Sequence, residues 1–207
     1  MAGEGTREQI LRASSTLFAR YGYHGTSTRQ IADAVGIRQP SIFYHFPSKA
    51  AIASAFLEVD LEPAIAVAEA LARAEGTAPA RLFTYVVGDI DRALSWPYDL
   101  GWLYTPEVLS DPALSEWQAR RAALFAALDE IIQQGIDEEA FVDEPPEFVR
   151  EVIFGMVQRT LFVYGGNRHV PPEDFGHHVG RFILRALLKD PERIDAVIAD
   201  TTEGARR

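Results

Sequence analysis

Hydrogen-bonding and basic side chains gather in one short stretch, GIRQPSIFYHFPSKAAI, which covers residues 36–52. Amide, hydroxyl, phenol and imidazole groups stand there around a small apolar stripe, together with Arg38 and Lys49. Groups of these kinds bond well to base edges and phosphate oxygens. The alternative is a helical hairpin that packs within the protein and contacts no other molecule, but this does not account for the polar side chains gathered on one face. The stretch therefore predicts a nucleic-acid contact surface.

Two short helices are expected to position these side chains, over residues 27–35 and 39–45. Ser27 followed by Gln30 is a capping-box pattern, and Gly36 is a natural helix end. Pro40 falls in the first turn of the second helix, where its missing N–H costs little. A turn of three residues with a glycine between two helices is typical of a helix-turn-helix.

Charge is divided unevenly along the chain, whose formal net charge is −10. Residues 1–50 hold six basic and three acidic residues, whereas residues 51–207 hold 14 basic and 27 acidic ones. Chance and a solvated surface are one explanation. The other is a basic binding head on an acidic body, which fits the polar stretch above.

A helical period dominates the rest of the chain, and no segment shows the alternation of a strand. The sequence predicts an all-α protein in which a three-helix head leads into a long helix and a larger helical body. Apolar spacing, caps and Pro positions place the expected helices at about 10–21, 27–35, 39–45, 48–73, 77–94, 111–134, 144–164 and 172–189, with a short one after 190.

Several classes of protein are not expected. The chain has no cysteine, so disulfides and thiolate metal sites are excluded. The N-terminus lacks the order of a signal peptide and no apolar run reaches about 18 residues, so a cytoplasmic protein without membrane contact is expected. No nucleophile or phosphate-loop motif occurs, so we expect no enzyme and no cofactor. The stretch HVPPEDFGHH does not predict a metal site, because adjacent histidines point about 100° apart on a helix.

The residues from Thr26 to Lys49, with the helix before them, resemble the DNA-binding domain of TetR-family transcriptional regulators. The matching pieces are LFARYGYHGTST, IADAVGI and YHFPSKAAI, and the resemblance covers about residues 7–52. It implies a helix-turn-helix DNA-binding domain over residues 1–50, whose second motif helix enters the major groove. It also implies a helical effector-binding and dimerisation domain over residues 51–207.

The resemblance assigns groove reading or phosphate contact to most of the polar residues in this stretch. Two arginines join them: Arg29 stands at a helix start, and Arg38 stands where the family often has a capping Ser or Thr. The family's usual Tyr and acid are replaced by Phe43 and Ala50. The residues expected to contact DNA are Thr26, Arg29, Arg38, Gln39, Pro40, Ser41, Tyr44, His45 and Lys49.

The last two long helices, at 145–164 and 172–189, carry apolar faces wider than one core contact needs. They either close the protomer core or pair with their copies as a four-helix bundle, which is the usual dimer interface of the family. The residues expected in that interface are Val152, Gly155, Val179, Phe182, Ile183 and Ala186.

Aromatic residues are dense between positions 83 and 125, where all three tryptophans lie. Core packing explains part of this density, and an effector pocket explains the rest. The pocket residues expected are Phe83, Tyr85, Trp96, Trp102, Tyr104, Trp117, Phe125, Met156, Gln158 and Arg159. Ring faces and the acidic body favour a neutral or cationic effector, although Gln158 and Arg159 suit a carboxylate instead.

The sequence thus predicts a homodimeric repressor that binds a palindromic double-stranded DNA operator and leaves it when an unidentified small molecule binds. One alternative is a DNA-binding activator or a regulator that answers a protein partner. A constitutive architectural dimer is a third possibility.

Overall fold

The computed structural model of the protein describes residues 5–164 and 173–204. Every regular element in these residues is a helix, which confirms the all-α prediction. The α-helices are α1 (Thr6–Tyr21), α2 (Thr28–Val35), α3 (Gln39–His45), α4 (Lys49–Arg73), α5 (Ala78–Ser95), α6 (Pro106–Leu109), α7 (Ser115–Asp137), α8 (Pro146–Tyr164), α9 (Phe175–Leu187) and α10 (Ile194–Gly204). The 3-10 helices are η1 (Gly101–Tyr104), η2 (Pro112–Leu114) and η4 (Pro191–Arg193).

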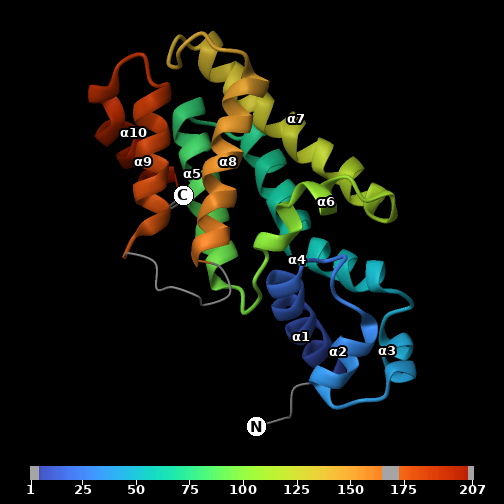
Figure 1. The fold of residues 1–207 in the computed structure, drawn as a ribbon. Coiled ribbons are helices and arrows are strands. Elements are labelled where there is room, and N and C mark those ends of the chain that lie inside the picture. Colours follow the sequence, from blue (N-terminus) through green and yellow to red (C-terminus); the bar gives the residue numbers. More distant parts are fainter. Residues whose placement is uncertain (1–4, 165–172, 205–207) are drawn as a thin grey trace.

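The helices form a small head and a larger body. Figure 1 shows α1, α2 and α3 together at one end, with α5 and α7 to α10 at the other and α4 between them. Within the described ranges, no helix combines the length and apolar character that crossing a bilayer requires.

Local signals set the ends of the head helices. The Ser27 hydroxyl accepts a bond from the Gln30 backbone N–H at 3.2 Å, and the Gln30 side chain accepts one from the Ser27 N–H at 2.8 Å. The predicted capping box is therefore formed. Gly36 ends α2 with a φ of 75°, a left-handed conformation that glycine adopts without strain. Arg38 precedes α3 without a side-chain cap bond.

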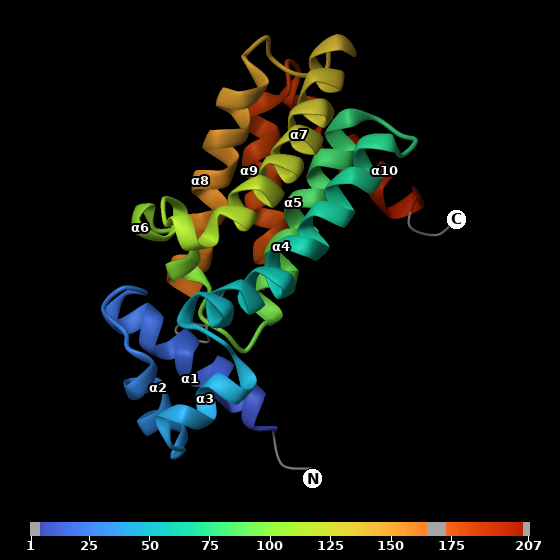
Figure 2. The same cartoon turned by 90° about the vertical axis from the view of Figure 1, so that its right-hand side faces the viewer.

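One helix belongs to both parts of the molecule. The first turns of α4 place Ile52 and Phe56 in the core shared with the head, where both side chains are fully buried. Further along, Leu61, Ile65 and Ala68 are buried in the body, where α4 packs along α7. Figure 2 shows α4 running from the head into the body without a break.

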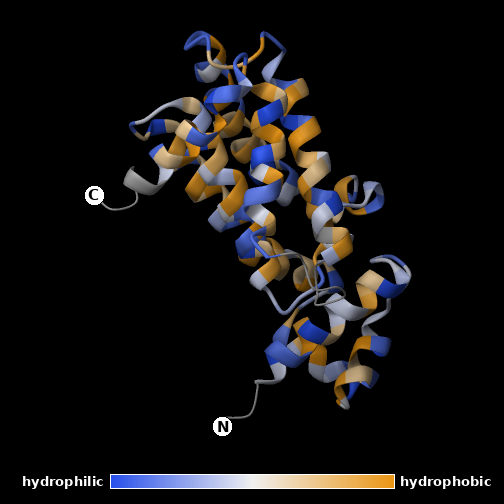
Figure 3. Ribbon diagram, turned by 90° about the vertical axis from the view of Figure 1, so that its left-hand side faces the viewer, coloured by the Kyte–Doolittle hydropathy of each residue, from blue (hydrophilic) through white to orange (hydrophobic). Residues whose placement is uncertain are grey.

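The body is built in layers around α5. This helix packs against α4, α7, α8, α9 and α10, so it lies at the centre. In Figure 3 the body helices carry long apolar stripes, as their burial requires. At the far end, the Phe141 ring lies against Gly135 of α7, and the backbone N–H of Val142 donates to the Leu187 carbonyl at 2.8 Å.

The connection between α5 and α7 is more ordered than expected. No helix was expected between residues 94 and 111, but this stretch contains η1 and α6. Thr105 is the N-cap of α6, and Pro106 is its first residue, a position that proline favours.

The start of α9 also differs from the expectation. This helix begins at Phe175 and not at residue 172, and the two residues 171–172 lie outside the described residues.

Gly135 and Gly88 give opposite expectations for the same substitution. A Cβ at Gly135 would overlap the Phe141 ring, with the ring Cγ 2.9 Å away, whereas a Cβ at Gly88 meets nothing within 4 Å. Gly135→Ala should lower the free energy of unfolding by about 1–3 kcal/mol through overpacking. Gly88→Ala should raise it by about 0.5–1 kcal/mol, since alanine favours helix. Urea unfolding measures both, and equal effects would contradict this packing.

Candidate DNA-binding and effector sites

The outer face of α3 is an exposed hydrogen-bonding surface of the head. Gln39, Pro40 and Ser41 are exposed, and Tyr44 is 89% exposed. On the opposite face of α3, Ile42 is completely buried and packs into the head core. The short helix is thereby held by its apolar side, while its polar side is free to meet another molecule.

Thr28 positions the first residue of that face, although the sequence did not indicate it. The Gln39 side-chain amide donates to the Thr28 hydroxyl at 3.0 Å, which links α3 to the start of α2. One amide hydrogen of Gln39 is used in this bond, and its carbonyl oxygen stays available. His45 is half-buried, with its ring 5.2 Å from the Tyr44 ring in an edge-on arrangement.

The expected phosphate contact of the Thr26 side chain is wrong. Thr26 is 1% exposed, and its hydroxyl donates to the carbonyl oxygens of Leu17 at 3.2 Å and Gly22 at 2.9 Å. Gly22 lies just past the end of α1, where carbonyls lack partners within the helix, so a nearby hydroxyl is drawn there. Thr26 therefore fixes the turn after α1.

Lys49 also braces this turn. Its ammonium group donates to the backbone carbonyls of Tyr23 at 2.8 Å and Thr26 at 3.0 Å, and lies 4.4 Å from the centre of the Tyr23 ring. Burial lowers the pKa of Lys49, while the acids Glu107 and Asp111 act in the opposite direction. By contrast, Arg29 and Arg38 are exposed at the start of α2 and just before α3.

The head is fastened to the body by the segment after α5. The Ser15 hydroxyl in α1 donates to the Asp99 carbonyl at 3.0 Å and accepts from the Asp99 N–H at 2.7 Å. The Trp102 ring lies 4.6 Å from Phe18 in α1 and 5.5 Å from Phe56 in α4. Trp102, expected in an effector pocket, is therefore part of this junction.

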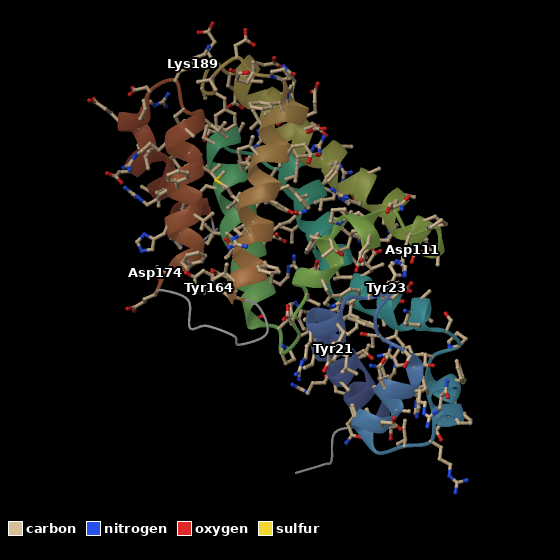
Figure 4. The ribbon with its side chains drawn as sticks, in the orientation of Figure 1. Tyr21, Tyr23, Asp111, Tyr164, Asp174 and Lys189 are labelled. Carbon is tan, nitrogen blue, oxygen red and sulfur yellow. The ribbon has the colours of Figure 1, made fainter. Side chains whose placement is uncertain are left out.

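A second contact joins the head to the residues before η2. The His24 Nε2 atom lies 3.5 Å from the Asp111 carboxylate. Figure 4 shows Tyr23 and Asp111 near one another where the two parts meet, and Asp111 adds to the effect of burial in raising the pKa of Tyr23. The segment at 98–111 therefore contacts the head at several points.

The structure does not bring the ten expected effector residues into one site. The Trp96 ring stacks on the Tyr98 ring with the ring centres 6.1 Å apart, in the segment that joins the head to the body. Phe83 faces His177 of α9 at 5.4 Å, and Tyr85 is buried. Gln158 is half-buried on α8. His169, the first residue of the stretch HVPPEDFGHH, lies outside the described residues.

Three of the ten do form a cluster between η1, α7 and α8. The Tyr104 ring lies 6.4 Å from Trp117 and 6.1 Å from Phe154, and Phe125 lies 5.1 Å from Phe154. The guanidinium of Arg121 stands among these rings. We refer to Tyr104, Trp117, Arg121, Phe125 and Phe154 as the aromatic cluster.

A buried group of charges adjoins the aromatic cluster. The Tyr104 hydroxyl donates to the Asp60 carboxylate of α4. Arg92 of α5 donates to the Asp60 carbonyl at 2.9 Å and pairs with the carboxylates of Asp60 and Asp89. Burial raises the pKa of Asp60, and burial together with the nearby Asp60 carboxylate raises the pKa of Asp89 to about 6, while Arg92 acts in the opposite direction on both. This group ties α4, α5 and η1 together.

The remaining two effector residues lie on the outer face of α8 and α9. A groove of about 540 Å³ between these helices is lined by Val152, Gly155, Met156, Arg159, Thr160, His178, Val179 and Phe182. Met156 and Arg159 thus share a surface with four of the residues expected between two copies. Phe182 is 65% exposed and Val152 is 48% exposed, and Ala186 is also exposed.

Ile183 was assigned to the same surface, and this was wrong. Its side chain is 2% exposed and packs into the protomer core. Adjacent helical residues point about 100° apart, so Phe182 faces outward while its neighbour faces inward.

Comparisons with known proteins agree with the head geometry. The family model for bacterial regulatory proteins of the tetR family matches residues 10–56. The HTH-type transcriptional repressor Rv1474c of Mycobacterium tuberculosis is 29% identical over 157 residues, which cover 73% of this chain and 77% of that protein.

Solved structures extend the likeness to the whole chain. The crystal structure of Mycobacterium smegmatis AmtR is 30% identical, with a TM-score of 0.79, covering 98% of this chain and 97% of that chain. AibR, solved in complex with isovaleryl coenzyme A and operator DNA, is 17% identical and shares the fold with a TM-score of 0.69, over 90% of this chain and 99% of that chain.

The similarity to AmtR includes both the head and the body, and the head match falls on the helices that form the helix-turn-helix. The expectation of a DNA-binding transcriptional regulator is confirmed by these relatives. The chain belongs to the TetR family of bacterial regulatory proteins.

Proposed function

We propose that the protein is a homodimeric repressor that holds a palindromic operator through α3 and releases it when a small molecule binds in the body. The observation that carries this proposal is the outer face of α3, where Gln39, Ser41 and Tyr44 are exposed beside Arg38. Amide and hydroxyl groups on a protruding helix suit base edges in the major groove.

The groove between α8 and α9 supports the dimer. Large apolar side chains at Val152 and Phe182 stand exposed on one continuous face, and such faces mark sites of association. A two-fold pairing of this face with its copy buries both sets of side chains at once. The two heads then reach successive major grooves, so half-site centres are separated by one helical turn or a multiple of it.

The segment at 98–111 and α4 connect the body to the head, so they can transmit the change that releases the operator. A small molecule that prefers one arrangement of the body shifts the population of dimers toward that arrangement. Because the segment at 98–111 contacts α1 and α4 enters the head, a shift in the body changes the spacing of the two heads. The operator then no longer fits both α3 helices. AibR, whose structure holds an acyl coenzyme A together with operator DNA, shares this fold.

Gln39 tests base reading by α3. Gln39→Ala should weaken binding to an operator selected from random DNA by about 1–3 kcal/mol and leave binding to unrelated DNA unchanged. The matched control is Thr28→Ala, which removes the internal partner of the Gln39 amide but keeps the amide itself. A gel-shift titration measures both. If Thr28→Ala loses as much operator affinity as Gln39→Ala, the amide serves only to hold the two helices together.

Arg29 tests the contact with the phosphate backbone. Arg29→Ala should weaken binding to all DNA sequences and reduce the slope of log K against log salt by about one unit, because one fewer counterion is released. Arg73→Ala, an exposed arginine at the body end of α4, is the control and should leave the slope unchanged. Equal slopes for wild type and Arg29→Ala would remove Arg29 from the interface.

Phe182 and Val152 test the dimer face. The double variant Phe182→Glu with Val152→Glu should be monomeric in light scattering and should lose operator binding, because charges cannot be buried unpaired between the copies. Val67→Glu places the same charge on an exposed apolar position of α4 and should remain dimeric. A dimer that survives the double substitution would put the interface on another face.

A further inference from the structure

Arg121 is a charged residue on the inward face of α7. The buried residues of this helix include Trp117, Leu124 and Leu128, and Arg121 lies on the same stripe, one turn after Trp117. Its side chain is half-buried, and burial lowers its pKa. Long charged side chains at such positions are normally paired, because removing an unpaired charge from water is costly.

Aromatic rings surround the guanidinium of Arg121. Its central carbon lies 4.5 Å from the centre of the Phe125 ring, 5.5 Å from that of Phe154 and 5.7 Å from that of Trp117. Its Nε–H is buried and has no hydrogen-bond partner among the described residues. The rings attract the cation, but they provide no oxygen acceptor for its donors.

The other inward-facing arginines of the body differ in this respect. Arg150 lies 4.1 Å from the centre of the same Phe125 ring, but its Nε donates to Asp129 at 2.8 Å and it also pairs with Glu151. Arg81 donates to two backbone carbonyls, at 3.2 and 3.0 Å. In residues 5–164 and 173–204, no carboxylate forms an ion pair with Arg121.

Cation–π attraction to these rings offsets part of the cost of withdrawing the guanidinium from water, but it leaves the buried Nε–H without an acceptor among the described residues. Glu151 raises the pKa of Arg121 from a distance but forms no ion pair with it, so in the described part of the chain the buried Nε–H has no anion to donate to. A carboxylate would accept from the guanidinium in a charge-assisted bond, which is about twice as strong as a neutral one. The neighbouring rings would cover an apolar group attached to it.

We infer that Arg121 is the anchor for the anionic head of the effector, a carboxylate whose apolar part lies against Trp117, Phe125 and Phe154. This inference rests on the proposed function, because only that function makes the bound molecule an effector. It replaces the neutral or cationic effector that the sequence favoured, because the cation among these rings is the chain's own guanidinium. It also moves the carboxylate from Arg159, which lies in the groove on the outer face of α8.

The position of Arg121 links such a ligand to the head. Tyr104 shares the aromatic cluster through Trp117 and Phe154, and its hydroxyl donates to Asp60 of α4. A ligand that displaces the Tyr104 ring therefore disturbs a bond to the helix that enters the head. Figure 2 shows α6, which follows Tyr104, beside the N-terminal half of α7.

Two tail-matched series test the head-group preference: decanoate, decanol and decylamine, and 4-phenylbutyrate, 4-phenylbutanol and 4-phenylbutylamine. Tryptophan fluorescence of the full-length protein reports binding, because Trp117 lies in the aromatic cluster. The carboxylate of at least one series should bind about tenfold more tightly than its alcohol and amine, as one charge-assisted bond requires. If both carboxylates bind no more tightly than their alcohols, the inference is overturned.

Variants separate anchoring from folding. Arg121→Gln should lose the carboxylate preference, and Arg121→Lys should keep part of it. Arg120→Gln, its neighbour that pairs with Glu62 on the surface, should bind as wild type does. Arg121→Met should unfold at the same or a higher temperature, since it removes an unpaired cation. Carboxylate binding by Arg121→Gln equal to that of wild type would assign the anion to another residue.

Operator gel shifts distinguish failure of this inference from failure of the proposed function. Without ligand, wild type and Arg121→Gln should bind the operator equally, and the carboxylate should release only the wild type. Release of both proteins at the same concentration would overturn the role of Arg121. If the wild-type carboxylate complex forms but no operator is bound at all, the proposed repressor function fails while the anion site stands.

Discussion

A single helix must be buried in two different cores at once, and the rest of the molecule is arranged around this requirement. The head end of α4 contributes Phe56 to the contacts with Trp102, and the body end contributes Leu61 and Ile65 to the packing against α7. The helix is continuous over 25 residues, although Pro63 within it removes one backbone hydrogen bond, so one unbroken element joins the two cores. The head is therefore oriented by the body although the two parts are separate in sequence.

The segment at 98–111 fixes the orientation of the head relative to the body. A helix alone would allow the head to turn about its axis, but Ser15, Trp102 and Asp111 join the head to the body away from α4. The same segment carries Tyr104, which bonds to the middle of α4. The proposed ligand site in the aromatic cluster and the proposed DNA-binding surface on α3 are in this way separated by only a few side-chain contacts.

Local rules were sufficient to predict the helix-turn-helix, and tertiary position decided what they missed. Ser27, Gln30 and Gly36 mark their helix ends through neighbours in the sequence, so the two helices of the motif were predictable. The burial of Thr26 depends on the carbonyls of α1, which no local pattern shows. Phe182 and Ile183 are both apolar, so composition could not tell which faces outward. Arg121 did carry a signal, because its spacing from Trp117 places it on the inward stripe.

The buried charges around Asp60 have a consequence for how α4 can move. An apolar helix face tolerates small slides, because one methyl group replaces another at little cost. Asp60 has no such freedom, since its partners Arg92 and Tyr104 are fixed on α5 and η1, and a buried carboxylate without them costs about 3–5 kcal/mol. A helix tied in this way resists small slides, because each slide breaks bonds to a buried carboxylate before new ones can form. Under the proposed function, we therefore expect the head to respond in a step and not by graded displacement.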